Sequence, residues 1–227
     1  YTTHSTIQCV FVALHTPEGI FFYALDFKFD NYPVIGDAPR YKKLGEVGKK
    51  GVKALVIDSL YSGTNRKTPS ERIARHLVEE TIMSVQNTKG AILITTFSSH
   101  IARLKSIVDF GKKTNRQIVF IGRSLNKYVN AAIKVNICPF KNDIKLLKFR
   151  NQINSFLSKV ERNRGKYLVV CTGHQGETGA ILDRISKDET PLKIRQGDNI
   201  IFCSSVIPDP TNINARERLD KKLRKKG

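Results

Sequence analysis

The sequence lacks several features that define other classes of protein. It has no tryptophan, one methionine and only 20 acidic residues against 39 basic ones. No apolar run approaches the roughly 18 residues that a membrane-spanning helix requires, and Tyr1 begins no charged-then-apolar leader. At 40% apolar residues the chain can still bury a core, which argues against wholesale disorder. We expect a soluble, cytoplasmic protein with no membrane partner.

Cysteine is scarce and widely spaced. Cys9, Cys138, Cys171 and Cys203 form no CxxC pair. This spacing argues against a zinc finger, a redox motif and a secreted disulfide framework. We expect buried thiols in a reducing compartment.

The excess of basic residues gives a formal charge of +19. Such a surface attracts polyanions, so nucleic acid and anionic membrane surfaces are its natural partners. Heat-adapted proteins are also rich in lysine, but they usually balance it with glutamate. The imbalance favours nucleic acid.

The first part of the chain shows strand patterns. Two short apolar runs at 10–14 and 20–25 flank a Pro- and Gly-bearing turn, which predicts a β-hairpin. The polar stretch 30–51 is expected to be a loop. Residues 52–57 are almost continuously apolar and predict a buried strand.

From residue 63 onward, strand and helix patterns alternate. A capping box from Thr68 to Glu71 predicts the start of a helix. Alternation of this kind predicts an α/β fold, with a mostly parallel sheet and helices on both faces. The further expected elements are strands at 91–96, 118–121, 168–172 and 200–204, and helices at 99–112, 125–132 and 179–185.

Two later segments are strongly basic. Residues 141–166 carry an apolar stripe from Leu146 and Leu147 to Val160, which predicts an amphipathic surface helix rather than a dedicated RNA contact. The tail 216–226 has seven basic residues and two acidic ones and predicts a helix with a basic face. Such a tail is either simply solvated or contacts phosphates.

The loops that follow the parallel strands are the expected ligand-binding edge. They are rich in glycine and hydroxyl groups, which suits phosphate, although these are also ordinary turn residues. Neither a P-loop nor GxGxxG occurs. His100 is at least as well explained as a helix cap. The candidate RNA or phosphate ligands are Ser98, Ser99, His100, Arg123, Ser124, Gly173, His174, Gly176 and Glu177.

Three possible metal ligands occur near expected strand ends in the first part of the chain: His4, Asp26 and Asp58. Histidine and aspartate suit a divalent ion such as Zn²⁺ or Mn²⁺. An aspartate at a strand end is more often a turn or capping residue, so spacing alone does not decide.

The strings around these residues occur in a recognisable order: THSTIQ, LDFKFD, IDS and CTGHQGE. In this order they resemble the ribonuclease J family, of the archaeal type. Members are metallo-β-lactamase-fold nucleases with an inserted β-CASP domain. The resemblance assigns His4 to one metal and Asp26 to a bridging position between two. It makes Asp58 the first β-CASP motif and, with Asp26, part of the catalytic group.

The resemblance also implies cofactors, partners and domains. It implies two divalent metal ions, zinc first with manganese or magnesium as alternatives, and single-stranded RNA bound between the domains; it leaves a homodimer open. Residues 1–62 would be part of a metallo-β-lactamase αββα sandwich. Residues 63–212 would be a β-CASP domain with a Rossmann-like sheet. Residues 213–227 would be a basic helix that leads back to the metallo-β-lactamase domain. His174 stands where the family commonly has a small residue.

The family's HxHxDH motif and its later histidine motifs are absent, which predicts a central fragment with an incomplete metal site. The parent protein is expected to be a ribonuclease that acts in RNA processing and decay. It would digest RNA from the 5′ end, with internal cleavage as a further activity. Two alternatives remain: a cleavage-and-polyadenylation-type β-CASP endonuclease, and, for the isolated chain, a non-catalytic RNA-binding module.

Overall fold

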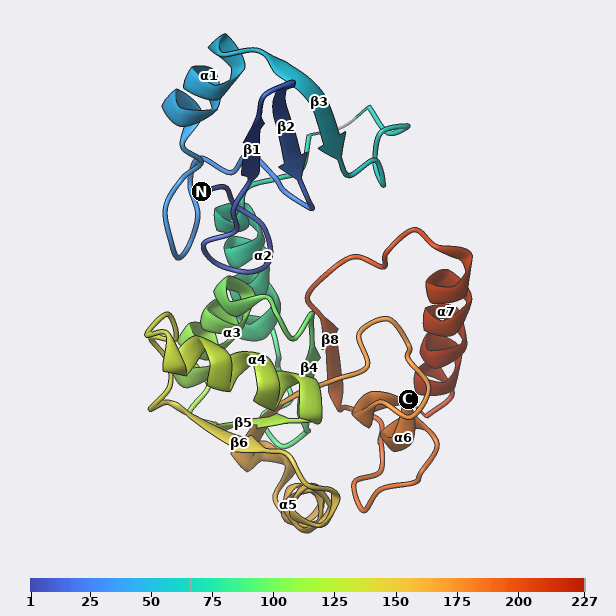
Figure 1. The fold of residues 1–227 in the computed structure, drawn as a ribbon. Helices are drawn as coiled ribbons and strands as arrows, with labels where there is room; N and C mark the ends of the chain where they lie inside the picture. Colours follow the sequence, from blue (N-terminus) through green and yellow to red (C-terminus); the bar gives the residue numbers. More distant parts are fainter. Residues whose placement is uncertain (66, 227) are drawn as a thin grey trace. The chain divides into compact units, whose positions relative to one another are not determined.

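The computed structural model describes residues 1–65 and 67–226, which fall into two compact units, Tyr1–His76 and Leu77–Gly227 (Figure 1). The first unit contains β1 (Val12–Thr16), β2 (Gly19–Ala24), α1 (Tyr41–Lys49) and β3 (Val52–Ile57). β2 lies in the middle of this sheet, antiparallel to β1 and parallel to β3. The predicted hairpin and the strand at 52–57 are confirmed.

Two predictions about this unit are wrong. The stretch expected as a polar loop contains α1, whose Leu44 and Val47 lie one turn apart while Gly45 and Gly48 weaken the helix signal. The strand β3 is not buried: Leu55 and its neighbours Val56 and Ile57 remain about half exposed. Side chains on both faces of β3 therefore remain partly open to solvent in the part of the chain that the structure describes.

The second unit is built on a five-stranded parallel sheet. Its strand order is β6 (Ile144–Leu147), β5 (Gln117–Ile121), β7 (Tyr167–Cys171), β4 (Ile92–Thr95) and β8 (Asn199–Phe202). These strands confirm the predicted α/β fold class with a parallel sheet.

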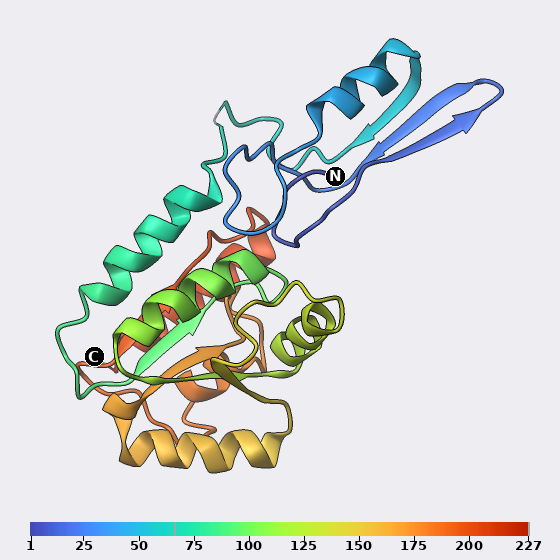
Figure 2. The same cartoon turned by 90° about the vertical axis from the view of Figure 1, so that its left-hand side faces the viewer.

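Helices cover both faces of that sheet (Figure 2). They include α3 (Ile101–Lys113), α4 (Arg123–Lys134), α5 (Arg150–Arg162), α6 (Ile181–Ser186) and α7 (Pro210–Arg224), with a short 3₁₀ helix η1 (Arg164–Lys166). Alternate strand residues such as Leu93, Val119 and Val169 enter one apolar core with residues of α5, α6 and α7. On the other face, Gly111 of α3 lies close to Leu168 and Ile118.

Helix boundaries required three corrections. The helix α2 (Glu71–Met83) begins after the predicted capping box, and the Ser70 hydroxyl accepts from the Arg72 amide at 3.2 Å. Leu146 and Leu147 belong to β6, although their spacing continues the stripe of α5. The basic tail helix starts at Pro210, where Asp209 caps it.

Along the chain, the first unit ends at His76 and the second begins at Leu77, and α7 contains residue 213. The expected division into 1–62, 63–212 and 213–227, with the domain names attached to it, stays a prediction. All four cysteines are free; Cys138, Cys171 and Cys203 are buried and Cys9 is partly buried. Within the described residues, the search found no helix with both the length and the apolarity that membrane crossing demands.

Candidate functional site

The loops at the carboxyl edge of the second unit's sheet are brought together as the parallel topology predicts. The Thr96 and Ser204 hydroxyls lie 2.9 Å apart, which joins the loops after β4 and β8. The Ser98 and Ser124 hydroxyls also lie 2.9 Å apart, which joins the loop after β4 to the start of α4. Hydroxyl groups from three loops therefore share this edge.

Gly122 makes the turn from β5 into α4. Its φ of +131° favours glycine, and a Cβ there would lie 2.7 Å from the Thr172 side chain. Its amide donates to the Leu147 carbonyl at 3.1 Å, so the loop after β5 is fixed to the end of β6. Arg123 and Ser124 follow immediately and are exposed, as a phosphate contact requires.

The loop 172–177 is packed against α7 rather than open. Gly176 has φ +79°, and a Cβ there would lie 2.4 Å from the Ala215 carbonyl oxygen. The Arg216 guanidinium donates to the His174 carbonyl at 3.0 Å, and the Gln175 side chain accepts from the Ile207 amide at 3.0 Å. The glycine at 176 is therefore explained by close packing onto the helix.

Two other predicted ligands of this loop differ in exposure. Gly173 is buried, and a Cβ there would lie 2.9 Å from Leu182. The exposed Glu177 carboxylate accepts from the Gln175 amide at 3.0 Å, which closes the loop on itself. The phosphate roles of Gly173, Gly176 and Glu177 stay predictions.

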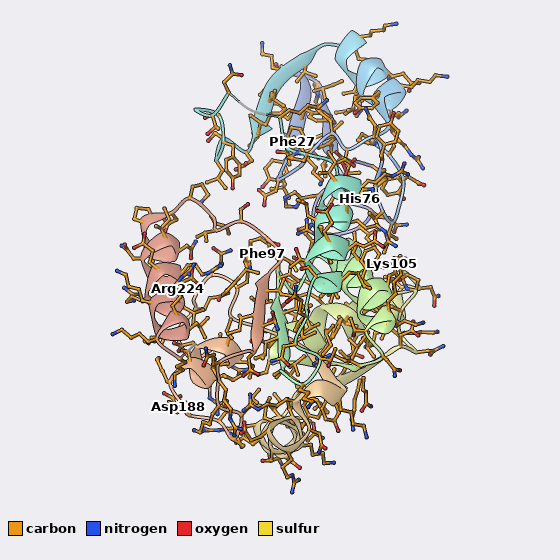
Figure 3. The ribbon with its side chains drawn as sticks, turned by 180° about the vertical axis from the view of Figure 1, so that it is seen from behind. Phe27, His76, Phe97, Lys105, Asp188 and Arg224 are labelled. Atoms are coloured by element: carbon orange, nitrogen blue, oxygen red, sulfur yellow. The ribbon has the colours of Figure 1, made fainter. Side chains whose placement is uncertain are left out.

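His174 belongs to this loop but is buried, only 2% exposed, and its ring lies near two aromatic rings. The ring centroids of Phe97 and Phe202 lie 5.1 and 6.1 Å from that of His174, and Phe97 lies where the chain leaves β4 (Figure 3). Nε2 is 3.2 Å from the Ser205 carbonyl oxygen. Burial, with a smaller contribution from the charge of Arg216, lowers the pKa of His174 to about 4, so the imidazole is neutral near pH 7. These contacts of the His174 ring hold the loop 172–177 against the interior of the second unit.

His100 caps α3, since its Nδ1 accepts from the Arg103 amide at 3.3 Å. The capping role weighed from the sequence is therefore present. Ser98 and Ser99, just before it, are partly exposed. Phosphate binding by these three residues stays a prediction.

The first unit brings its three predicted metal-site residues together. Thr3 and Lys28 form a backbone bridge, with the Lys28 amide donating to the Thr3 carbonyl at 2.8 Å, which sets His4 beside the segment of Asp26. Ala24 pairs with Ile57, so Asp58 leaves its strand next to the same segment. Burial lowers the pKa of His4, while the charges of Asp26 and Asp58 raise it.

Imidazole and carboxylate groups are suitable ligands for a divalent metal, but these three side chains do not form a metal site by themselves. No group of three or more His, Cys, Asp or Glu side chains within 1–65 and 67–226 is arranged to hold a metal ion. A catalytic zinc usually has about three protein ligands, so the residues of this chain do not complete such a site. Their roles as ligands stay predictions.

Sequence reasoning missed two groups of residues. Asp30 is buried and accepts from the amides of Glu71 at 2.7 Å and Tyr32 at 2.9 Å, and these hydrogen bonds outweigh burial to lower its pKa. The second group, 148–150, follows β6 at the carboxyl edge, and reading Leu146 and Leu147 as helical concealed it. The signal that could have found it was a Lys-Phe-Arg run just after an apolar segment.

Comparison with known proteins gives consistent matches. Residues 89–219 match the family model "Ribonuclease J, beta-CASP domain". The chain is 42% identical to Ribonuclease J of Pyrococcus abyssi over 99% of its own length and 49% of that relative's. It is 39% identical to Ribonuclease J of Methanocaldococcus jannaschii over 98% of the chain and 50% of the relative. Ribonuclease J of Synechocystis is 32% identical over 96% of the chain. The chain spans about half the length of the first two relatives.

Proposed function

Because this chain belongs to the ribonuclease J family, we propose that the protein containing it is a metal-dependent ribonuclease that hydrolyses RNA phosphodiester bonds. The observation that supports this proposal most strongly is the similarity to Ribonuclease J across 99% of the chain, which includes both units. The proposed mode is 5′-to-3′ digestion of single-stranded RNA, with internal cleavage as a further activity. The free, mostly buried thiols suit a reducing compartment such as the cytoplasm.

The proposal gives the two units different tasks. His4 and Asp26 would bind divalent metal, zinc first, together with ligands that this chain does not supply, and Asp58 would orient that group. Bound metal supplies charge neutralisation at the scissile phosphate. The hydroxyl-rich edge of the second unit would position the RNA backbone through groups such as Ser98, Arg123 and Ser124.

For the isolated chain, a non-catalytic RNA-binding module is the second candidate. It is favoured by the +19 charge together with the incomplete set of metal ligands in the described residues. A cleavage-and-polyadenylation-type enzyme has less support, because the matching family model is that of ribonuclease J.

The test uses the full-length protein and single-stranded RNA labelled at its 5′ end. A 5′-to-3′ exonuclease releases labelled mononucleotide as its first product, whereas an endonuclease releases longer labelled fragments. EDTA should abolish cleavage and added zinc should restore it. Cleavage undiminished in EDTA, or none under any condition, would contradict the proposal.

A further inference from the structure

An exposed aromatic ring lies among cations where the chain leaves β6. We propose that Lys148, Phe149 and Arg150, with Arg123 beside them, bind single-stranded RNA, with a base stacked on the Phe149 ring and phosphates against the three cations. The inference rests on the proposed function and deepens it by naming a nucleotide-binding surface.

The strand register places these residues side by side. Ile121 of β5 pairs with Leu147 of β6, and the Gly122 amide donates to the Leu147 carbonyl at 3.1 Å. Arg123 therefore follows the end of β5 at the same edge where Lys148 follows the end of β6. The contact between Ser124 and Ser98 then connects this group to the loop after β4.

The ring and the cations are available for binding. Phe149 is 57% exposed, and the Lys148 ammonium lies 5.4 Å from its ring centroid. Arg123, Lys148 and Arg150 are exposed, and in the part of the chain that the structure describes none of them pairs with a carboxylate. The ranges 122–134 and 144–160 contain seven basic residues and no acidic one. The positive charge here is therefore not neutralised locally.

Local helix chemistry does not explain these residues. Phe149 occupies the N-cap of α5 and makes no capping hydrogen bond, where Ser, Thr, Asp or Asn would stabilise the helix. Arg150 then places a positive charge in the first turn, against the helix dipole, as Arg123 does in α4. Residues that break local rules without a packing gain point to a functional requirement.

An aromatic ring flanked by cations matches the chemistry of an unpaired nucleotide. Aromatic side chains stack on any base, while basic groups follow the backbone, so such a surface prefers single strands and has little sequence preference. A duplex hides its base faces, so the ring would contribute nothing to duplex binding.

The test measures RNA affinity of the full-length protein in EDTA by fluorescence anisotropy, using a labelled adenine oligoribonucleotide. F149S should weaken binding by about fivefold or more, and F149Y should retain it. V135S, which alters another exposed apolar residue of the second unit, is the matched control and should bind normally. An oligomer of abasic ribose phosphates should bind wild type and F149S equally. K148A and R150A should each reduce the steepness of the log–log salt dependence by about 0.7.

Thermal unfolding separates lost contacts from lost folding. Because serine is a better N-cap than phenylalanine, the midpoint of F149S should not fall. Unchanged RNA affinity in F149S would overturn the inference. If F149S instead lost self-association in sedimentation while retaining RNA affinity, the face would belong to a protein partner and the inference would again be wrong. If the wild-type protein neither bound nor cleaved RNA, the proposed function itself would fail. That result is distinct from the two F149S results, which would overturn only the binding surface.

Discussion

The Cys171 thiol lies wholly inside the core at the end of β7, and burial raises its pKa to about 12. Because the thiolate is the reactive form, Cys171 should be inert in the native protein, as should the buried Cys138 and Cys203. Only Cys9 should react with Ellman's reagent, and slowly, since burial also raises its pKa. In denaturant all four should react. Rapid modification of native Cys171, located by mass spectrometry, would contradict this description of the core.

His174 predicts a pH dependence of stability. Its pKa is 6.5 when exposed and about 4 in the folded chain, so between these values the unfolded state binds the extra proton. Stability from the neutral ring is therefore fully present above about pH 6.5 and is lost as pH falls toward 4, by at most about 3 kcal/mol. Urea unfolding at pH 7 and pH 5 should show a smaller decline in H174Q than in wild type. Equal declines would mean that His174 is not buried as a neutral ring.

At the scale of elements, Arg116 holds together the amino edge of the five-stranded sheet. Its buried guanidinium donates to the carbonyls of Thr88 and Gly90, both at 2.8 Å, and to those of Arg164 and Tyr167, both at 3.2 Å. It thereby joins the segments before β4 and β7 to the start of β5.

Removing this side chain should leave four carbonyls without their donor. R116A is expected to lower the free energy of unfolding by at least about 3 kcal/mol, measured by urea titration. The matched control is K113A, which breaks a surface ion pair with Glu79 and should cost less than about 1 kcal/mol. Similar losses in the two variants would show that the Arg116 contacts are not important for stability.

Some of the helices and strands could be predicted from sequence patterns and others could not. The strands β4, β5 and β7 were predictable because buried parallel strands read as nearly continuous apolar runs. α1 was missed because Gly45 and Gly48 suppress its helical signal. β6 was missed because Leu146 and Leu147 fit the period of the following helix, and separating the two required the pairing with β5.

The candidate site was predictable only in part. Hydroxyl groups at the carboxyl edge follow from topology, and they do meet there, as Ser98 and Ser124 show. The burial of His174 was not predictable, because it depends on Phe97, Phe202 and Arg216, which come from distant parts of the chain. Pairwise contacts of that kind are set by tertiary packing rather than by local pattern.

For the whole molecule, the +19 charge is distributed unevenly. Several acidic residues of the second unit already pair with particular cations: Asp198 with Arg164 at 2.6 Å, and Asp183 with Lys187 at 2.7 Å. The cations that follow β5 and β6 have no such partners among the described residues. The uncompensated charge therefore includes the edge where RNA is proposed to bind.

The most direct test of the central proposal is the rate at which the full-length protein cleaves single-stranded RNA when Asp26 is replaced by alanine. D37A, an exposed aspartate of the same unit, is the matched control. If Asp26 holds metal for a ribonuclease, D26A should lose at least about a hundredfold in rate and bind less zinc, while D37A cleaves normally. Cleavage by D26A at the wild-type rate would contradict the account.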